Sequence, residues 1–308
     1  MGHAHHHHGG PALRRRENAR RLWIALAINA AMLVAAVLGG LLTGSLALLA
    51  EAGHVLSDAG SIGIALLAAR LAAVAPTPSR TFGLQRSEIV AAFVNGVTLV
   101  VVAVLVLVAA ISRLSDPPEV AGLGVLLLGL VGLAGNAVAT LVLAGGERED
   151  VNLEAVLRHS FGDALSSMGV VVAGAVILIT GWNTIDPLIS IAIAVLIAAS
   201  AWRPVKEPLD VLLEAAPAGM DVTTVGEAMC SVQEVVEVHD LHVWTVTSGF
   251  PALSAHVTVA HGADRDRARR GVESVLHERF GIDHTTLQMV EGERVEGLIQ
   301  IEKAERPA

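Results

Sequence analysis

The chain of 308 residues is 53% hydrophobic, with a mean hydropathy of +0.60, which is too apolar for an ordinary soluble domain and indicates a membrane protein. Its single cysteine, Cys230, excludes both an intrachain disulfide and a thiolate metal cluster. The formal charge of −9 falls mostly on residues 203–308, which hold 18 acidic and 10 basic residues, so no nucleic-acid partner is expected.

Several segments before residue 203 carry little or no charge over the roughly 20 residues that a helix needs to cross a bilayer. The apolar stretch that starts at Leu22 is too long for one span and is interrupted by Gly-Gly and then by Thr-Gly-Ser. The pattern predicts six transmembrane helices joined by short loops. They cover residues 22–43, 45–71, 89–112, 120–143, 153–180 and 186–202.

The arginines of this region gather at one set of predicted helix ends, and only Arg113 lies near the opposite ends. Because basic residues remain on the cytoplasmic side, both termini are expected in the cytoplasm. The expected location is the cell membrane, as a multi-pass protein of the bacterial inner membrane. The arginines on the expected cytoplasmic side are Arg14, Arg15, Arg16, Arg20, Arg21, Arg70, Arg80, Arg86, Arg148 and Arg158.

After residue 202 the hydrophobic pattern becomes that of a small aqueous domain. The predicted elements are a helix at 221–229, strands at 235–247 and 252–260, an amphipathic helix at 264–280 and a strand at 285–290. This αββαβ order indicates an open α+β sandwich. The predicted domains are a cytoplasmic His/Arg-rich segment (1–20), a six-helix transmembrane domain (21–203), a cytoplasmic αββαβ domain (204–300) and a tail (301–308).

Two predicted spans each carry a histidine and an aspartate four residues apart, His54 with Asp58 and His159 with Asp163. Residues i and i+4 share one face of a helix, so two such faces turned together offer two imidazole nitrogens and two carboxylates. That donor set suits a tetrahedral Zn²⁺ ion. Each such group costs about 2.5–3.5 kcal/mol if it faces lipid, and shared coordination of a cation would offset that cost. The alternative is an interhelical polar cluster that only holds the bundle together.

Five segments of the chain resemble signatures of the cation diffusion facilitator family, and together they span nearly the whole chain after Arg20. They are GGLLTGSLALLAEAGHVLSDAGSI (39–62), FGLQRSEIVAAFVNG (82–96), RHSFGDALSSMGV (158–170), VHDLHVWTVTSGFPALSAHVTV (238–259) and FGIDHTTLQM (280–289). Two positions depart from the family pattern. Ala36 stands where many relatives carry a glutamate, and Glu51 stands where the family has an aspartate.

The resemblance implies a homodimeric exporter of divalent metals, with six helices and a ferredoxin-like (metallochaperone-like) cytoplasmic domain, that exchanges cytoplasmic metal for protons. Because protonated histidine and aspartate release metal, the expected mechanism is alternating access. It also implies that His54, Asp58, His159 and Asp163 are the transport-site ligands. A histidine at the first position of both motifs resembles the zinc-exporting branch. Zn²⁺ is therefore the expected substrate, with Cd²⁺ or Co²⁺ as alternatives, and no cofactor is expected.

Two further groups are interpreted through the same resemblance, and a third through its composition. His239 and His256 match positions that bind cytosolic zinc in some members, with Glu291 near a third ligand position. Arg86 and Glu214 match a basic and an acidic residue that form a gating salt bridge. An N-terminal cluster predicts weak zinc binding, and its interrupted run favours a native segment over an expression tag. This cluster consists of His3, His5, His6, His7 and His8.

Two other functions remain open from the residues alone. One is a membrane-bound metal-dependent enzyme, but four protein ligands would leave no open position for water on the metal, so no enzymatic activity is expected. The other is a metal sensor without transport, in which the acidic C-terminal domain is the working part.

Overall fold

The computed structural model describes residues 11–144, 153–292 and 300–302, and the chain divides into two compact units. The first unit contains residues up to 64 together with 94–203. The second unit contains residues 65–93 together with the chain from 204 onwards. Residues 65–93 cover the end of the second helix, the connection and the start of the third helix, and they group with the C-terminal part of the chain.

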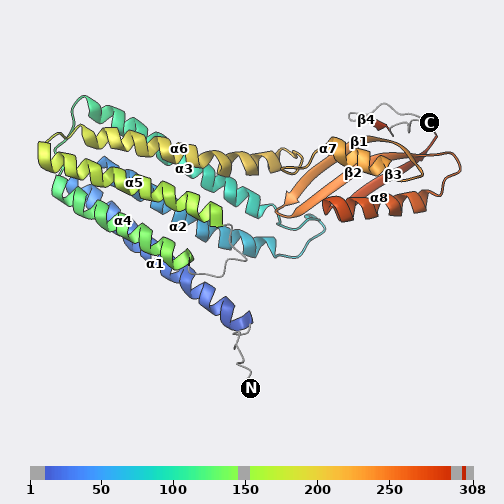
Figure 1. The fold of residues 1–308 in the computed structure, drawn as a ribbon, viewed down its shortest axis with the longest axis horizontal. Coiled ribbons are helices and arrows are strands. Elements are labelled where there is room, and N and C mark those ends of the chain that lie inside the picture. Colours follow the sequence, from blue (N-terminus) through green and yellow to red (C-terminus); the bar gives the residue numbers. More distant parts are fainter. Residues whose placement is uncertain (1–10, 145–152, 293–299, 303–308) are drawn as a thin grey trace, which may run out of the picture. The chain divides into compact units, whose positions relative to one another are not determined.

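Six long helices occupy the predicted positions (Figure 1). Four stretches of the described residues, in the third to sixth helices, are long and apolar enough to cross a membrane, and the first two helices contain the shorter apolar stretches Ala27–Thr43 and Leu46–Ser57. The helices are α1 (Pro11–Thr43), α2 (Leu46–Ala72), α3 (Ser87–Leu114), α4 (Gly122–Ala144), α5 (Leu153–Thr180) and α6 (Ile185–Leu212).

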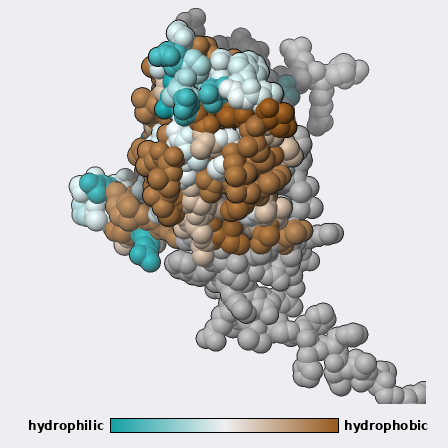
Figure 2. All heavy atoms as spheres, turned by 90° about the vertical axis from the view of Figure 1, so that its left-hand side faces the viewer, coloured by the Kyte–Doolittle hydropathy of each residue, from teal (hydrophilic) through white to brown (hydrophobic). Residues whose placement is uncertain are grey.

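These helices expose large apolar side chains to a degree that is unfavourable in water. On α3, the side chains of Val104, Leu105 and Val108 are each more than half exposed. Figure 2 looks onto one end of the helices and shows hydrophobic side chains over most of the described surface, with hydrophilic ones gathered in small areas. Exposed apolar faces of this extent belong against lipid or another protein.

Two helix boundaries differ from the prediction. The helix α1 begins at Pro11, so the arginine-rich half of the predicted N-terminal segment is helical. The helix α6 continues ten residues past 202, through Pro204 and Pro208, and Lys206 pairs with Asp210 one turn later. Hydropathy indicates where the apolar, membrane-spanning part of a helix ends. The helix itself can continue into water when polar pairs four residues apart stabilise it.

The first turn of α2 is held by a carboxylate from α6. Asp186 is completely buried, and its Oδ1 accepts a hydrogen bond from Ser45 Oγ at 2.5 Å. Its other oxygen accepts from the backbone N–H of Leu46 at 2.7 Å. Ser45 Oγ in turn accepts from the N–H of Leu48 at 3.2 Å, as a helix N-cap does. This interaction fixes the beginning of the helix that carries His54.

Close contact between α4 and α5 depends on glycine. A Cβ atom at Gly174 would lie 2.4 Å from the backbone nitrogen of Leu126, and one at Gly129 would lie 3.0 Å from the backbone nitrogen of Val171. Small residues of this kind let membrane helices approach until their backbones touch. The separation of α4 and α5 is thus set by these two positions.

The C-terminal domain is a four-stranded sheet with two helices that share its core. Strands β1 (Val235–Thr247) and β2 (Phe250–Val259) form an antiparallel hairpin, and β3 (His284–Glu291) runs parallel to β2. The sheet order is β3-β2-β1-β4, where β4 is Gln300–Glu302. The helices α7 (Val222–Cys230) and α8 (Arg265–Phe280) contribute buried residues to the same core. The αββαβ prediction lacked β4, because three residues are too few for alternation to be recognised.

Candidate metal centre

His54 and Asp163 are brought together by two different helices. The Nε2 atom of His54, on α2, lies 2.9 Å from Oδ1 of Asp163, on α5, which is hydrogen-bond distance. Both side chains are largely buried, with 11% and 18% of their surface exposed. An imidazole and a carboxylate that face one another between apolar helices can supply two ligand atoms to a divalent cation.

Asp58 and His159 occupy the other two positions of the predicted site. The backbone of α2 carries Asp58 one turn after His54, and the backbone of α5 carries His159 one turn before Asp163. The side chains of Asp58 and His159 lie outside the described residues. The structure therefore brings one histidine–aspartate pair together, and the four-ligand site stays a prediction.

A polar network that the metal-site prediction did not include lies one turn from this pair. Both carboxylate oxygens of Glu51, on α2, accept hydrogen bonds from α5: Oε2 from Ser166, and Oε1 from Ser167 at 2.6 Å. Asn136, on α4, donates to Ser167 Oγ at 3.0 Å, and its Nδ2 lies 3.5 Å from the carbonyl oxygen of Asp163. An acidic residue inside an apolar span was the signal that could have identified Glu51.

A second candidate ion site lies in the C-terminal sheet. His239 and His256 are register partners on β1 and β2, and their ring centroids are 5.1 Å apart. Together with Asp240 they form a group whose potential ligand atoms all lie within 4.8 Å of one another. His239 is completely buried, and neither of its ring nitrogens has a hydrogen-bond partner among the residues that the structure describes. A buried polar group in that state is costly, and an ion would satisfy it.

Asp240 joins this group through a distortion of β1. The strand register shifts between His239 and His242, and Asp240 adopts a left-handed backbone conformation with φ of 49°. Such bulges redirect side chains from the alternation of a regular strand. As a result, the Asp240 carboxylate lies 3.9 Å from His256 Nδ1. Glu237 Oε1 lies 4.0 Å from His239 Nδ1 in the same buried region.

Glu291 is not part of this group, although the sequence resemblance placed it near a third ligand position. In the parallel register of β2 and β3, Glu291 is opposite Val259, whereas His256 is opposite Gln288. Glu291 therefore lies three residues, or about 10 Å, further along the strand. The third residue of the group is Asp240 instead.

The carboxylate of Glu291 has a different set of partners at the end of β3. It accepts hydrogen bonds from the backbone N–H of Gly262 at 2.9 Å and from Arg265 Nη2 at 2.6 Å. His261 Nδ1 also lies 2.9 Å from it. These contacts, the Gly262 bond first and the Arg265 bond second, hold the pKa of Glu291 below its usual value. Glu291 is thus an anchor for the loop between β2 and α8.

Two family models match consecutive parts of the chain. The model of the cation efflux transmembrane domain matches residues 22–213, which is more than half of the chain, and the model of the cation efflux protein cytoplasmic domain matches residues 217–291. The chain belongs to the cation diffusion facilitator family. A helical transmembrane domain followed by a ferredoxin-like cytoplasmic domain is thereby confirmed. The family consists of efflux transporters rather than enzymes, which removes the membrane-bound enzyme as an alternative.

This cation diffusion facilitator is similar to several transporters over nearly its whole length. It is 37% identical over 294 residues to the cadmium, cobalt and zinc/H(+)-K(+) antiporter of Bacillus velezensis, covering 94% of this chain and 92% of that protein. It is 38% identical over 291 residues to the zinc transporter ZitB of Escherichia coli K12, with coverage of 94% and 92%. It is 34% identical over 288 residues to the metal cation efflux system protein CzcD of Cupriavidus metallidurans, with coverage of 93% and 89%. A solved structure of the metal-bound C-terminal domain of the CzcD transporter matches 23% of this chain and 99% of its own at 28% identity, with a TM-score of 0.22.

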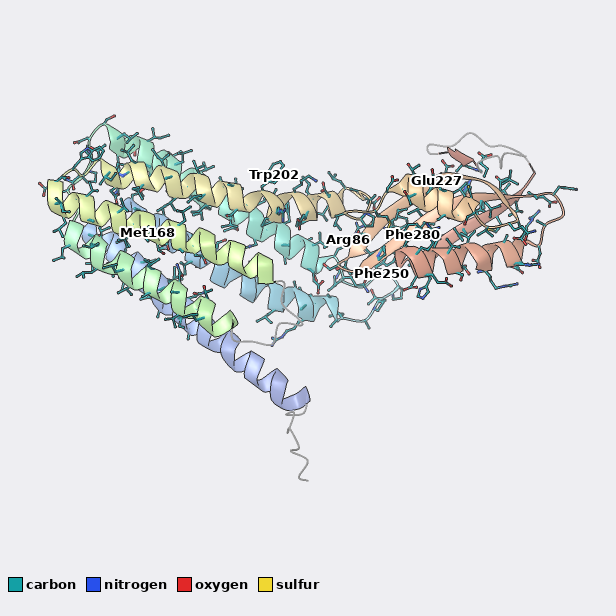
Figure 3. All side chains as sticks on the ribbon, in the orientation of Figure 1. Arg86, Met168, Trp202, Glu227, Phe250 and Phe280 are labelled. Atoms are coloured by element: carbon teal, nitrogen blue, oxygen red, sulfur yellow. The ribbon has the colours of Figure 1, made fainter. Side chains whose placement is uncertain are left out.

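Arg86 and Glu214 of this cation diffusion facilitator lie close together within the second unit. Arg86 Nη2 is 3.6 Å from Glu214 Oε1, and both side chains are exposed. An exposed ion pair contributes roughly 0–1 kcal/mol. Nearby, Thr247 Oγ1, at the end of β1, donates to Glu88 Oε2 on α3 at 3.3 Å. Figure 3 labels Arg86, just before α3, and Phe250, at the start of β2.

The five N-terminal histidines (His3, His5, His6, His7 and His8) lie outside the described residues.

Proposed function

We propose that this protein exports Zn²⁺ from the cytoplasm in exchange for protons, by alternating access, for metal resistance and homeostasis. The observation that carries the proposal is the contact between His54 of α2 and Asp163 of α5 within the apolar helices. Two of the similar transporters are named for zinc transport, which supports this substrate. A site of two histidines and two aspartates also accepts other borderline ions, so Cd²⁺ and Co²⁺ are the alternative substrates.

Proton coupling follows from the chemistry of the pair. Neutral imidazole and ionised carboxylate bind metal, whereas their protonated forms release it. Histidine changes protonation near pH 6.5, close to the pH values on the two sides of a cell membrane. A metal ion bound by His54 and Asp163 must replace their mutual hydrogen bond. A proton arriving on His54 allows that bond to form again as an ion pair, which favours release of the metal.

We further propose the arrangement of the protein in the membrane. Both termini face the cytoplasm of a bacterial cell, because the arginines gather at one set of helix ends. The functional unit is a homodimer, which the match of residues 217–291 to the cytoplasmic domain of cation efflux proteins supports. In this arrangement, the N-terminal histidines would collect zinc weakly at the cytoplasmic entrance.

The cytoplasmic domain has a proposed regulatory role that rests on its own observation. His239, Asp240 and His256 would bind a cytosolic divalent ion, since the buried His239 nitrogens lack partners among the described residues. Such an ion can regulate transport only if it binds one conformation of the protein more tightly than another. The Arg86–Glu214 pair is the proposed gating contact, because it joins a residue just before α3 to one just after α6.

The test is zinc uptake into inverted membrane vesicles with an imposed proton gradient. Wild-type protein should accumulate zinc, and Asp163→Ala and Asp58→Ala should abolish uptake because each removes an anionic ligand. Asp116→Ala, which changes an exposed aspartate in the connection between α3 and α4, is the matched control and should transport normally. Normal uptake by Asp163→Ala would show that the site assignment is wrong.

A further inference from the structure

Glu51 is a buried acidic residue that the transport proposal does not use. Glu51 is 5% exposed, and its partners Ser166 and Ser167 are 4% and 1% exposed. Its two oxygens accept one hydrogen bond from each serine, so a single side chain of α2 is tied to two neighbouring residues of α5. Lipid tails provide no hydrophobic force that pulls helices together, so bonds of this kind contribute to holding them in register.

The position of this link relative to the metal pair is its second important feature. Glu51 lies three residues before His54, and Ser166 lies three residues after Asp163. Residues three apart lie on the same side of a helix. The link therefore joins the same two helices as the His54–Asp163 pair, about one turn away from it. Asn136 of α4 extends the network to the backbone of Asp163.

The side chains that line the cavity beside the link offer no replacement for it. Glu51 and Ser167 line a cavity of about 20 Å³ between α1, α2, α4 and α5. All other lining residues are apolar: Met32, Ala35, Ala36, Leu48, Val55, Leu128, Gly129, Val131, Gly132 and Val170. A cavity of this size holds about one water molecule. If the carboxyl group were removed, the serine hydroxyls would have no new acceptor among these lining side chains.

We propose that Glu51 is a positioning residue for metal transport. Its hydrogen bonds to Ser166 and Ser167 set the register of α2 against α5, and that register places His54 opposite Asp163. Glu51 acts through length and hydrogen bonding, without touching the metal or carrying a proton. The inference rests on the proposed function of the His54–Asp163 pair.

Substitutions of Glu51 itself and of its two serine partners distinguish a positioning role from a role of the negative charge. Glu51→Gln keeps the length of the side chain, and its amide can accept from one serine and donate to the other. Glu51→Asp keeps the carboxylate but is one methylene too short to reach both serines. The double variant Ser166→Ala/Ser167→Ala removes the partners while leaving Glu51 intact. Ser190→Ala is the matched control, since among the residues that the structure describes this buried hydroxyl donates to the carbonyl of Asp186 in its own helix.

The measurements are zinc uptake kinetics in vesicles, zinc affinity of the purified full-length protein by calorimetry, and its unfolding temperature. The double serine variant and Glu51→Asp should weaken zinc binding and raise KM roughly tenfold, with kcat changed less than about twofold. Glu51→Gln should remain within about threefold of wild type in both constants. Ser190→Ala should match wild type, and the unfolding temperatures identify any variant that has failed to fold.

Two results would overturn the proposal. If Glu51→Asp behaved like wild type while Glu51→Gln lost transport, Glu51 would act by its charge, as a ligand or a proton carrier. If the folded double serine variant had wild-type zinc affinity and KM, the link would not position the site. Failure of the proposed function itself would look different, because the wild-type protein would then show no proton-driven zinc uptake, and both ideas would fall.

Discussion

The substitution Asp186→Ala tests how the helix that carries His54 is anchored. The carboxylate of Asp186 accepts from Ser45 Oγ, from Leu46 N and, at 3.3 Å, from Ala47 N. Alanine would leave these three donors buried without that acceptor. At about 0.6–1.5 kcal/mol for each bond, and roughly 0.3–1 kcal/mol for a negative group at a helix N-terminus, the free energy of unfolding should fall by about 3 kcal/mol.

Thermal unfolding of the purified protein in detergent, followed by far-ultraviolet circular dichroism, measures this loss. At about 2–4 °C for each kcal/mol in a unit of this size, the midpoint for Asp186→Ala should fall by about 6–12 °C. The control Asp116→Ala removes an exposed aspartate at the same end of the helices and should leave the midpoint unchanged. If Asp186→Ala unfolded at the wild-type temperature, the reasoning that this carboxylate stabilises the start of α2 would be refuted.

Three other outcomes follow from the structure. Gly174→Ala should destabilise the helices by about 1–3 kcal/mol, because its Cβ would overlap the backbone of Leu126. Gly132→Ala is the control: its Cβ would lie 3.7 Å from the nearest atom, so it should be tolerated in the same unfolding assay. In an Asp163→Ala background that lacks the transport site, calorimetry should detect a zinc-binding step that is tighter than the weak binding of the N-terminal histidines and that His256→Ala removes. Persistence of this tighter step in the His256→Ala variant would contradict the cytoplasmic site. Since the pKa of Glu291 lies below its ordinary 4.5, its contribution to stability is present above pH 4.5 and is lost as the pH falls through the lowered pKa. Glu291→Gln should therefore lose stability at neutral pH and show a smaller decline in acid, and identical acid unfolding curves for the two proteins would argue against this.

The candidate metal pair illustrates what a local pattern can predict. The four-residue spacing of His54 with Asp58, and of His159 with Asp163, was enough to indicate two faces with metal ligands. The pattern could not say how far each helix is rotated or shifted along its axis. The contact of His54 with Asp163, 109 residues apart, depends on that packing. The family resemblance likewise paired His239 with His256 but could not predict the bulge that adds Asp240 to them.

The sequence by itself determined which segments enter the membrane, which segments form the α+β domain, and which residue types can bind a divalent ion, because hydropathy, periodicity and ligand chemistry are properties of short stretches. Only the tertiary structure decided that Asp186 caps α2, that Glu51 is tied to two serines of α5, and that Glu291 lies away from the histidines of the sheet. The bonded partners lie far apart in the chain, and the distance of Glu291 from the histidines depends on which residues of β2 and β3 are opposite one another. Their pairing depends on the close approach of helix backbones and on strand register, which the whole fold sets at once.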